Sequence, residues 1–208
     1  MRVYETNFLA TENPLSEGGV WDNGGVVGLR WNNVMTTPGR CHGVPSEHDP
    51  QYADPTAILK GNWGSDQEVE AVVFQDQENA GYFQEVEIRL RSVMQPNFCS
   101  GYEVFWRVLK TANGYFQIVR WNGQFGDFTY LADLQGAQYG AGNGDRVKAR
   151  IRGNKISAWL NGVLVTEVID DVFKTGRPGL GFNYGMQATN DDFGFTYYKA
   201  TSGILYHF

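Results

Sequence analysis

The segment spanning residues 144–182 constrains the fold more than any other part of the chain. It opens with apolar and basic residues in strict alternation: Arg146, Val147, Lys148, Ala149, Arg150, Ile151, Arg152. This two-residue period is typical of a strand with one buried and one solvated face. Gly153-Asn154 marks a turn, and Asn161-Gly162 is suited to a type I′ hairpin turn because both central residues need a positive φ. We therefore predict three antiparallel strands here, with Trp159 on the solvated face of the middle one.

Similar alternating segments recur along the rest of the chain, separated by Gly, Asn and Pro. No stretch sustains the apolar period of a long helix. The strands expected outside the opening segment span residues 3–8, 26–31, 57–59, 67–75, 82–91, 102–109, 115–121, 128–132 and 192–200. Residues 36–55 contain four prolines and are expected to form a long loop, which in a compact domain is often functional. The 208 residues fit one domain, 1–208, and the fold class expected is an all-β, two-sheet antiparallel β-sandwich.

Composition and charge narrow the range of partners. The formal net charge of −6 disfavours nucleic acid, which usually selects a basic surface, so the basic row at 146–152 is interpreted as a solvated or ion-paired strand face. No apolar run is long enough for a membrane span. No signal-peptide pattern is visible, which leaves the location open, with an extracellular or virion surface as candidates. The two cysteines, Cys41 and Cys99, are expected to be free thiols, with a single disulfide between them as the alternative.

Three stretches carry a resemblance to a known superfamily. They are FLATENPLSEGGVW (8–21), GYEVFWR with YFQIVRWNG (101–123), and ISAWLNGVLV with DDVFKTGRPGLGF (156–182). The last contains a G-x-P-G-x-G-F return, formed by Gly176, Pro178, Gly179, Gly181 and Phe182. The chain resembles the concanavalin A-like, laminin-G-like jelly-roll superfamily, which implies a jelly-roll sandwich. This superfold hosts lectins, glycan-binding modules, glycoside hydrolases, polysaccharide lyases and structural domains, so the function stays open.

The acidic pair Glu85 and Glu87 is a candidate hydrolase site. Retaining glycosidases need two carboxyl groups about 5–5.5 Å apart, and laminarinase-type enzymes carry Glu-x-Asp-x-x-Glu on one strand. By alternation, Val86, Ile88 and Leu90 are expected to face the core, and Glu85 and Glu87 the opposite side. Arg89 and Arg91 occupy the next positions on the face of Glu85 and Glu87, where further acids would be expected. We therefore favour an ion-paired face with partners on neighbouring strands. If the chain is an enzyme, the residues expected to line its cleft are Glu85, Glu87, Arg89, Glu103 and Arg107.

A polysaccharide lyase is the other enzymatic alternative. The segment 87–91, Glu-Ile-Arg-Leu-Arg, is loosely similar to the Arg-x-Glu-Leu-Arg strand of alginate-lyase-type enzymes. The Gln-Ile-His strand that should accompany it is replaced by Gln117-Ile118-Val119, which lacks the histidine. The three histidines, His42, His48 and His207, fall in loops or at the end of the chain. A lyase needs an acid-base pair, and the sequence shows none.

Paired acids are the candidates for a calcium site. His42 and His48, with Glu47 or Asp49, could form another metal site, although a polar loop explains these residues equally well. Calcium prefers carboxylate and carbonyl oxygens in loops, and the acids that could supply them are Asp170, Asp171, Asp191 and Asp192. Their spacing is not that of an EF-hand loop. We expect no cofactor, and a structural calcium ion remains open.

Glycan binding requires the least chemistry, because sugars stack on aromatic rings while polar groups take their hydroxyls. The ligand-binding candidates are Trp159, Trp121, Tyr115 and Arg120. The expected function is a non-catalytic carbohydrate-binding or surface-adhesion module, with a virion or filament surface protein as a specific form. The apolar end of the chain, 204–208, suggests a homo-oligomer or an assembly partner. The alternatives are a lyase or hydrolase on the same fold and a purely structural interaction domain.

Overall fold

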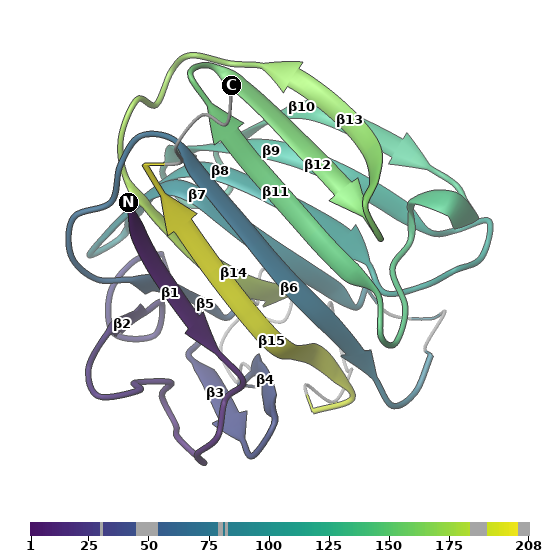
Figure 1. Cartoon of the computed structure of the whole chain (residues 1–208), viewed down its shortest axis with the longest axis horizontal. Helices are drawn as coiled ribbons and strands as arrows, with labels where there is room; N and C mark the ends of the chain where they lie inside the picture. Colours follow the sequence, from purple (N-terminus) through teal and green to yellow (C-terminus); the bar gives the residue numbers. More distant parts are fainter. Residues whose placement is uncertain (30, 45–53, 79–80, 82, 184–190, 204–208) are drawn as a thin grey trace.

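The computed structural model describes residues 1–29, 31–44, 54–78, 81, 83–183 and 191–203. Two antiparallel sheets pack face to face in an open sandwich, as Figure 1 shows, and this is the predicted fold class. Within these residues the only helix is a single 3-10 turn, η1 (Ala137–Tyr139). No helix in the described ranges is long and apolar enough to cross a membrane.

The first sheet has eight strands and contains the predicted three-strand meander. Asn161 and Gly162 both have positive φ, 52° and 80°, as the type I′ hairpin requires. The strands of this sheet are, in spatial order, β13 (Val163–Ile169), β12 (Lys155–Leu160), β11 (Arg146–Arg152), β6 (Gln67–Gln75), β15 (Phe193–Ser202), β4 (Arg40–Gly43) and β3 (Val34–Thr37), with β1 (Arg2–Thr6) paired to β15.

The second sheet has seven strands and carries the candidate site on its outer face. Four of its strands are joined in sequence by hairpins, and β14 enters between β7 and β5. The strands are, in spatial order, β10 (Phe128–Gln135), β9 (Tyr115–Gly123), β8 (Phe98–Arg107), β7 (Glu85–Gln95), β14 (Arg177–Asn183), β5 (Thr56–Leu59) and β2 (Trp21–Asn23).

The main hydrophobic core lies between the sheets and follows the alternation in the sequence. On β7, Val86, Ile88 and Leu90 are fully buried in it, as are Trp106 and Phe116 on the next two strands, whose rings lie 5.0 Å apart. Each large apolar side chain removed from water contributes about 1.5–3 kcal/mol. Because successive side chains point to opposite faces, the polar residues between the core positions must project from the outer face of the seven-stranded sheet.

A second, smaller hydrophobic cluster covers part of that outer face. Residues 24–29 and 31–33 fold over it and place Trp31 edge-on against Trp121, with ring centroids 5.0 Å apart. The strand predicted at residues 26–31 is wrong, because the segment turns: the amides of Val26 and Val27 both donate to the carbonyl of Asn23. As a result, polar side chains on this face of the sheet are buried instead of solvated.

Two further expectations need correction. Residues 36–55 are not all irregular, since β3 and β4 form a hairpin that includes Thr36 and Cys41, while 45–53 lie outside the described residues. Arg91 does not continue the outer face of β7, because a bulge between Leu90 and Val93 gives it a φ of 48°. The two cysteines are free, as expected, and both are buried.

The side chain of Arg91 turns instead toward loops that belong to the other sheet. Its guanidinium donates to three backbone carbonyls, those of Ser65 at 2.7 Å, Gly153 at 2.7 Å and Phe173 at 2.8 Å. Its own amide donates to the side chain of Gln67 at 2.8 Å. Arg91 therefore links the two sheets and takes no part in the outer face.

Candidate functional site

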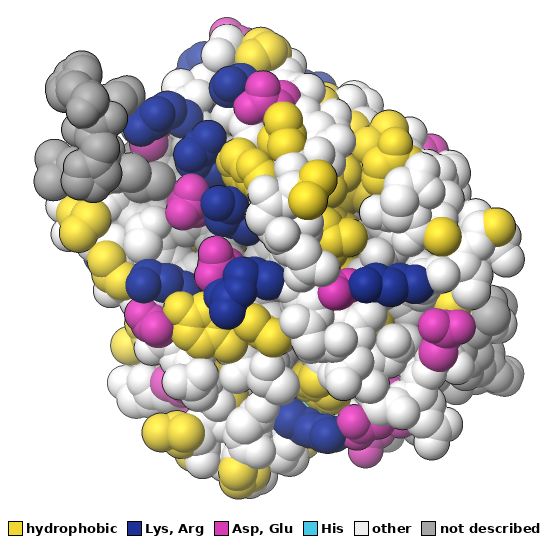
Figure 2. Space-filling view, turned by 45° about the vertical axis from the view of Figure 1, so that its right-hand side comes forward, with side chains coloured by type: hydrophobic (Ala, Val, Ile, Leu, Met, Phe, Trp, Pro, Cys, Tyr) yellow, Lys and Arg dark blue, Asp and Glu magenta, His cyan; other side chains and the backbone are white. Residues whose placement is uncertain are grey.

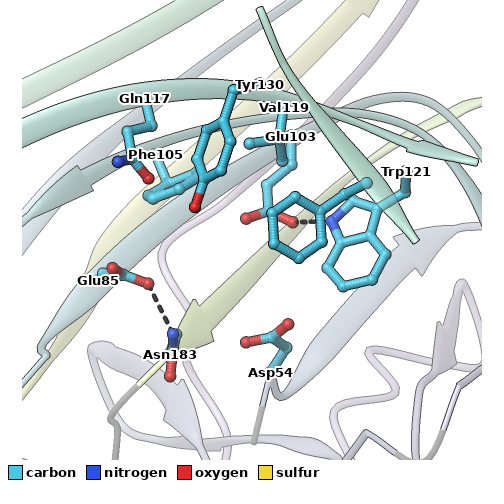
Figure 3. A pocket seen from close by; sticks show the side chains of 10 residues that line it. Asp54, Glu85, Glu103, Phe105, Gln117, Val119, Trp121, Tyr130 and Asn183 are labelled. Atoms are coloured by element: carbon cyan, nitrogen blue, oxygen red, sulfur yellow. Dashed lines mark hydrogen bonds between the residues drawn. The ribbon is translucent and has the colours of Figure 1, made fainter. Parts of the chain in front are cut away.

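A hollow of about 150 Å³ lies on the outer face of the seven-stranded sheet. Its walls come from five adjacent strands, β10, β9, β8, β7 and β14, and from the residues just before β5. Aromatic, amide and carboxyl side chains share the lining (Figure 3): Asp54, Glu85, Glu103, Phe105, Gln117, Val119, Trp121, Phe128, Tyr130 and Asn183. None of these lining residues is Lys, Arg or His.

A buried ion triad forms the floor beside this hollow. Arg89 on β7 lies directly opposite Glu103 on β8, and its guanidinium contacts Glu103 at 2.5 Å and Glu87 at 2.7 Å. The guanidinium also lies over the ring of Trp31, 4.7 Å from its centroid. The ion pairs expected across these strands are therefore present, but they are removed from water, which the sequence did not indicate.

The charge on Glu87 is only partly compensated. Its Oε2 bonds Arg89, while its Oε1 has no hydrogen-bond partner among the described residues. Burial raises the pKa of Glu87 well above its usual value, and the nearby Glu103 carboxylate adds to this effect. Burial also raises the pKa of Glu103, against the opposing influence of Arg89 and the indole N–H of Trp121.

Glu85 occupies another wall of the hollow, as Figure 3 shows. It accepts hydrogen bonds from the hydroxyl of Tyr115 and from Nδ2 of Asn183, the latter at 2.8 Å. Burial raises the pKa of Glu85 to about 7, although both hydrogen bonds favour the ionised form. A carboxyl group with this pKa exchanges its proton near neutral pH.

Asp54 is a member of the site that sequence reasoning missed. Its side chain is 6% exposed, and its carboxylate has no hydrogen-bond partner among the described residues. Burial raises its pKa well above the usual value, and Glu103 strengthens the effect. Figure 3 shows the Asp54 carboxylate facing the hollow across from Tyr130. The only available signal was its place in the proline-rich loop that was expected to be functional.

The structure brings together some of the predicted binding residues and separates others. Trp121 and Tyr115 project from the outer face, where their polar atoms donate to Glu103 and Glu85 respectively. Arg120, one position away on the same strand, points the other way and pairs with Asp170. Arg107 lies at the edge of the site, where its Nη1 donates to the carbonyl of Asn113 at 3.0 Å.

Trp159 lies far from the hollow, on the outer face of the eight-stranded sheet. Its half-buried ring is flanked by two basic side chains of β11, with Lys148 Nζ 4.4 Å and the Arg150 guanidinium 4.8 Å from the ring centroid. Lys and Arg are interspersed with Asp and Glu over this side of the molecule (Figure 2). Pairs such as Arg150–Glu68 account for the basic row in the sequence.

Two of the acids named as calcium candidates, Asp170 and Asp171, take part in other contacts. The carboxylate of Asp170 accepts from the Tyr102 hydroxyl at 2.6 Å and the Val172 amide at 3.0 Å, besides pairing with Arg120. Asp171 pairs with Lys174 at 3.2 Å, and Asp191 and Asp192 immediately precede β15. In the ranges that the structure describes, no group of three or more His, Cys, Asp or Glu side chains is placed to hold a metal ion.

The comparisons with known proteins concern the fold. No protein-family model and no curated protein sequence matches the chain. Similar solved structures include the carbohydrate binding module CBM66 from Bacillus subtilis, with a TM-score of 0.60 and 14% identity over 90% of this chain and 96% of that one. The metal-free carbohydrate recognition domain of Emp46p gives a TM-score of 0.62 and 11% identity, with 96% of each chain covered.

A third similar structure is an enzyme, a prokaryotic β-1,3-1,4-glucanase (lichenase) derived from a mouse hindgut metagenome. Its TM-score is 0.54 with 14% identity, over 98% of this chain and all of that one. Identities this low establish a shared fold and leave the activity open. Together with the two antiparallel sheets, they show that the chain has the concanavalin A-like jelly-roll fold.

Proposed function

We propose that this chain binds a carbohydrate, without cleaving it, in the hollow on the outer face of the seven-stranded sheet. The observation that carries the proposal is the joint lining of one small cavity by aromatic rings and by carboxyl and amide groups. Apolar walls with a few well-placed polar groups are typical of small-molecule sites. A volume of about 150 Å³ accommodates one six-membered ring, so the site takes a single sugar residue.

The aromatic wall supports this proposal. The rings of Trp121, Phe128 and Tyr130 contact one another in sequence, with centroids 5.1 and 5.4 Å apart. Tyr130 is 56% exposed, so its ring is available to the apolar face of a sugar. Carboxyl and amide side chains on the other walls supply acceptors and donors for hydroxyl groups. The names of two structural neighbours, a carbohydrate binding module and a carbohydrate recognition domain, agree with this assignment.

The charge of the lining argues against a lyase for acidic polysaccharides. Such an enzyme must hold a uronate carboxylate, and the described lining offers it no cationic side chain. Asp54, Glu85 and Glu103 would instead repel it. Neutral or cationic sugars fit the hollow better than acidic ones.

Glycoside hydrolysis is the second candidate, and one observation favours it. Glu85 has a pKa of about 7 because of burial, which suits a general acid, and it shares the hollow with the carboxyl group of Glu103. Against this, Arg89 and Trp121 both bind Glu103, which lowers its nucleophilicity and fixes its orientation. Binding without turnover is therefore the better-supported function.

A glycan panel tests the proposal. Binding is expected for the wild-type chain and should be lost in Tyr130→Ala, because that variant removes the exposed ring of the hollow. Trp159→Ala serves as a matched control, since Trp159 is a half-buried aromatic residue on the other sheet and its removal should leave binding unchanged. If the wild-type chain releases reducing ends and Glu85→Gln abolishes this release, the function is hydrolysis and not binding alone. If the panel shows neither binding nor turnover, the remaining interpretation is a structural interaction domain.

A surface role, on a virion or a filament, is a finer form of this proposal. The edge strand β13 supports it, because Val163 and Ile169 are 71% and 64% exposed and an uncovered apolar edge can pair with another chain. Assembly through this edge predicts oligomers that grow with protein concentration. Light scattering that reports a monomer at high concentration would contradict the assembly role and leave glycan binding untouched.

A further inference from the structure

We propose that the sugar bound in the hollow carries a free, protonated amino group, as in a 2-amino-2-deoxyhexose, and that this ammonium group lies against Asp54 and Glu103. This inference rests on the proposed glycan-binding function and assigns its ligand class. It is carried by the charge balance among the described residues of the hollow, by the Asp54 carboxylate, which none of them contacts through a hydrogen bond or an ion pair, and by the aromatic walls.

Among the residues that the structure describes, buried carboxyl groups outnumber buried cations around the hollow. Four acids gather here, Asp54, Glu85, Glu87 and Glu103, and each is at most 6% exposed. Arg89 lies between two of them, and Arg107 stands at the edge near Glu85. A buried charge is costly unless it is paired, so we expect some of these acids to be protonated in the free protein. A ligand cation removes the need for this protonation by supplying the missing positive charge.

Asp54 shows where that charge should enter. It is the lining carboxylate that no described residue contacts by a hydrogen bond or an ion pair, yet it is 6% exposed and faces the hollow (Figure 3). Glu103 lines the same hollow and already binds Arg89 and Trp121 with one of its oxygens, Oε2. An ammonium group has three donors and no acceptor, which matches a wall of carboxylate oxygens.

The aromatic side chains favour the same ligand. Phe105, Trp121, Phe128 and Tyr130 line the hollow together with the acids. Cations are attracted to the faces of aromatic rings, and the attraction is larger where water is excluded. An N-acetylated sugar lacks the charge, and a uronic acid carries the wrong one, so neither uses both features of the site.

The protonation state of the acids provides a second measurable consequence of the proposal. Burial raises the pKa of Asp54, with Glu103, Arg89 and Glu85 as the charged groups that act on it. A cation bound beside these carboxyls favours their ionised forms, so binding an amino sugar should release protons. Binding an uncharged sugar should not.

Calorimetry with three oligosaccharides of equal length and linkage tests the inference: β-1,4-linked glucosamine, N-acetylglucosamine and glucose trimers, at about pH 6, where the amine is protonated. The glucosamine trimer should bind at least about tenfold more tightly than the other two. Asp54→Asn, which keeps the shape of the side chain, should abolish that difference. Asp76→Asn removes an exposed acid that pairs with Arg40, and it should leave the preference intact.

A second measurement uses only the wild-type chain. Repeating the titration in buffers of different ionisation enthalpy should reveal proton release with the glucosamine trimer. Equal affinity for all three trimers, or binding of the amino sugar without proton release, overturns the amino-sugar assignment while glycan binding stands. If Tyr130→Ala leaves the affinity for every sugar unchanged, the site itself is wrong, and the proposed function fails with it.

Discussion

Arg89 and Glu103 lie directly opposite each other on β7 and β8, and their side chains form an ion pair at 2.5 Å with almost no exposure to solvent. The attraction between two charges is strong in this environment, but so is the cost of removing them from water. The arrangement is therefore stable only while every member of the triad with Glu87 is present.

Removing the arginine should be severely destabilising. Arg89→Met leaves Glu87 and Glu103 buried without their counter-ion, and we expect the free energy of unfolding to fall by about 3–5 kcal/mol. Urea denaturation measures this loss. Arg146→Met is the control, because its pair with Glu70 is largely exposed and should contribute less than about 1 kcal/mol. Equal effects of the two substitutions would contradict the buried triad.

Stability should fall as the pH rises toward neutrality. Burial raises the pKa of Glu85 from 4.5 to about 7, so the folded chain binds more protons than the unfolded chain between these values. The contribution of Glu85 is complete below its unfolded pKa and is lost as the pH approaches 7, which amounts to roughly 3 kcal/mol at most. The groups that face Glu85 are Tyr115, Asn183, Glu103, Arg107 and, at longer range, Tyr130.

Denaturation curves between about pH 5 and pH 8 test this dependence. Glu85→Gln should flatten the profile in part, because the raised pKa values of Asp54, Glu87 and Glu103 give slopes of the same sign. A wild-type profile that rises across this range would show that these acids are ionised in the folded state without cost.

Gly181 on β14 should not tolerate even a methyl group. A Cβ there would lie 2.2 Å from Oε2 of Glu87, the oxygen that binds Arg89. Gly181→Ala must displace that carboxylate, and we expect a loss of about 1–3 kcal/mol in thermal or chemical unfolding. Gly142→Ala is the matched control, since its nearest neighbour is the flexible side chain of Lys110 at 3.4 Å, and it should change stability by less than about 0.5 kcal/mol.

Asp170 should stabilise the chain with or without calcium. Partial burial works against ionisation, but hydrogen bonds from Tyr102 and Val172 and the charge of Arg120 lower the pKa of Asp170 below its usual value. Asp170→Asn should therefore cost about 1–3 kcal/mol near neutral pH, while Asp171→Asn, at an exposed pair, should be nearly neutral. Thermal unfolding of Asp170→Asn with added calcium and with a chelator decides whether a metal is involved. A loss seen only when calcium is present would favour the metal site.

Much of the fold could be predicted, because its strands and turns follow patterns among neighbouring residues. The alternation at residues 85–90 placed Val86, Ile88 and Leu90 in the core and Glu85, Glu87 and Arg89 on the opposite face, as observed. The hairpin turn at Asn161-Gly162 could be predicted in the same way. Such signals depend only on neighbouring residues, which is why they survive without tertiary information.

The candidate site was less accessible, because its character depends on contacts distant in sequence. The sequence at 26–31 predicts a strand, whereas the described residues 24–29 and 31–33 fold over the sheet and convert a polar face into a buried one. No residue of β7 itself indicates the bulge that turns Arg91 away. The one sequence feature that relates to it is Gly101 on the facing strand, where a Cβ would lie 2.7 Å from Cα of Ser92. Asp54 was invisible because nothing local relates it to β7 or β8.

Arg91 holds three connecting segments together at one end of the sandwich. Its guanidinium holds the loop before β6, the turn between β11 and β12, and the segment before β14, through the carbonyls of Ser65, Gly153 and Phe173. These three connections are far apart in the sequence. If one of them moved away alone, the buried guanidinium of Arg91 would lose a hydrogen-bond partner, which is costly. That end of the molecule should open in a single cooperative event, whereas the rim of the hollow, with its exposed Tyr130, is free to adapt to what it binds.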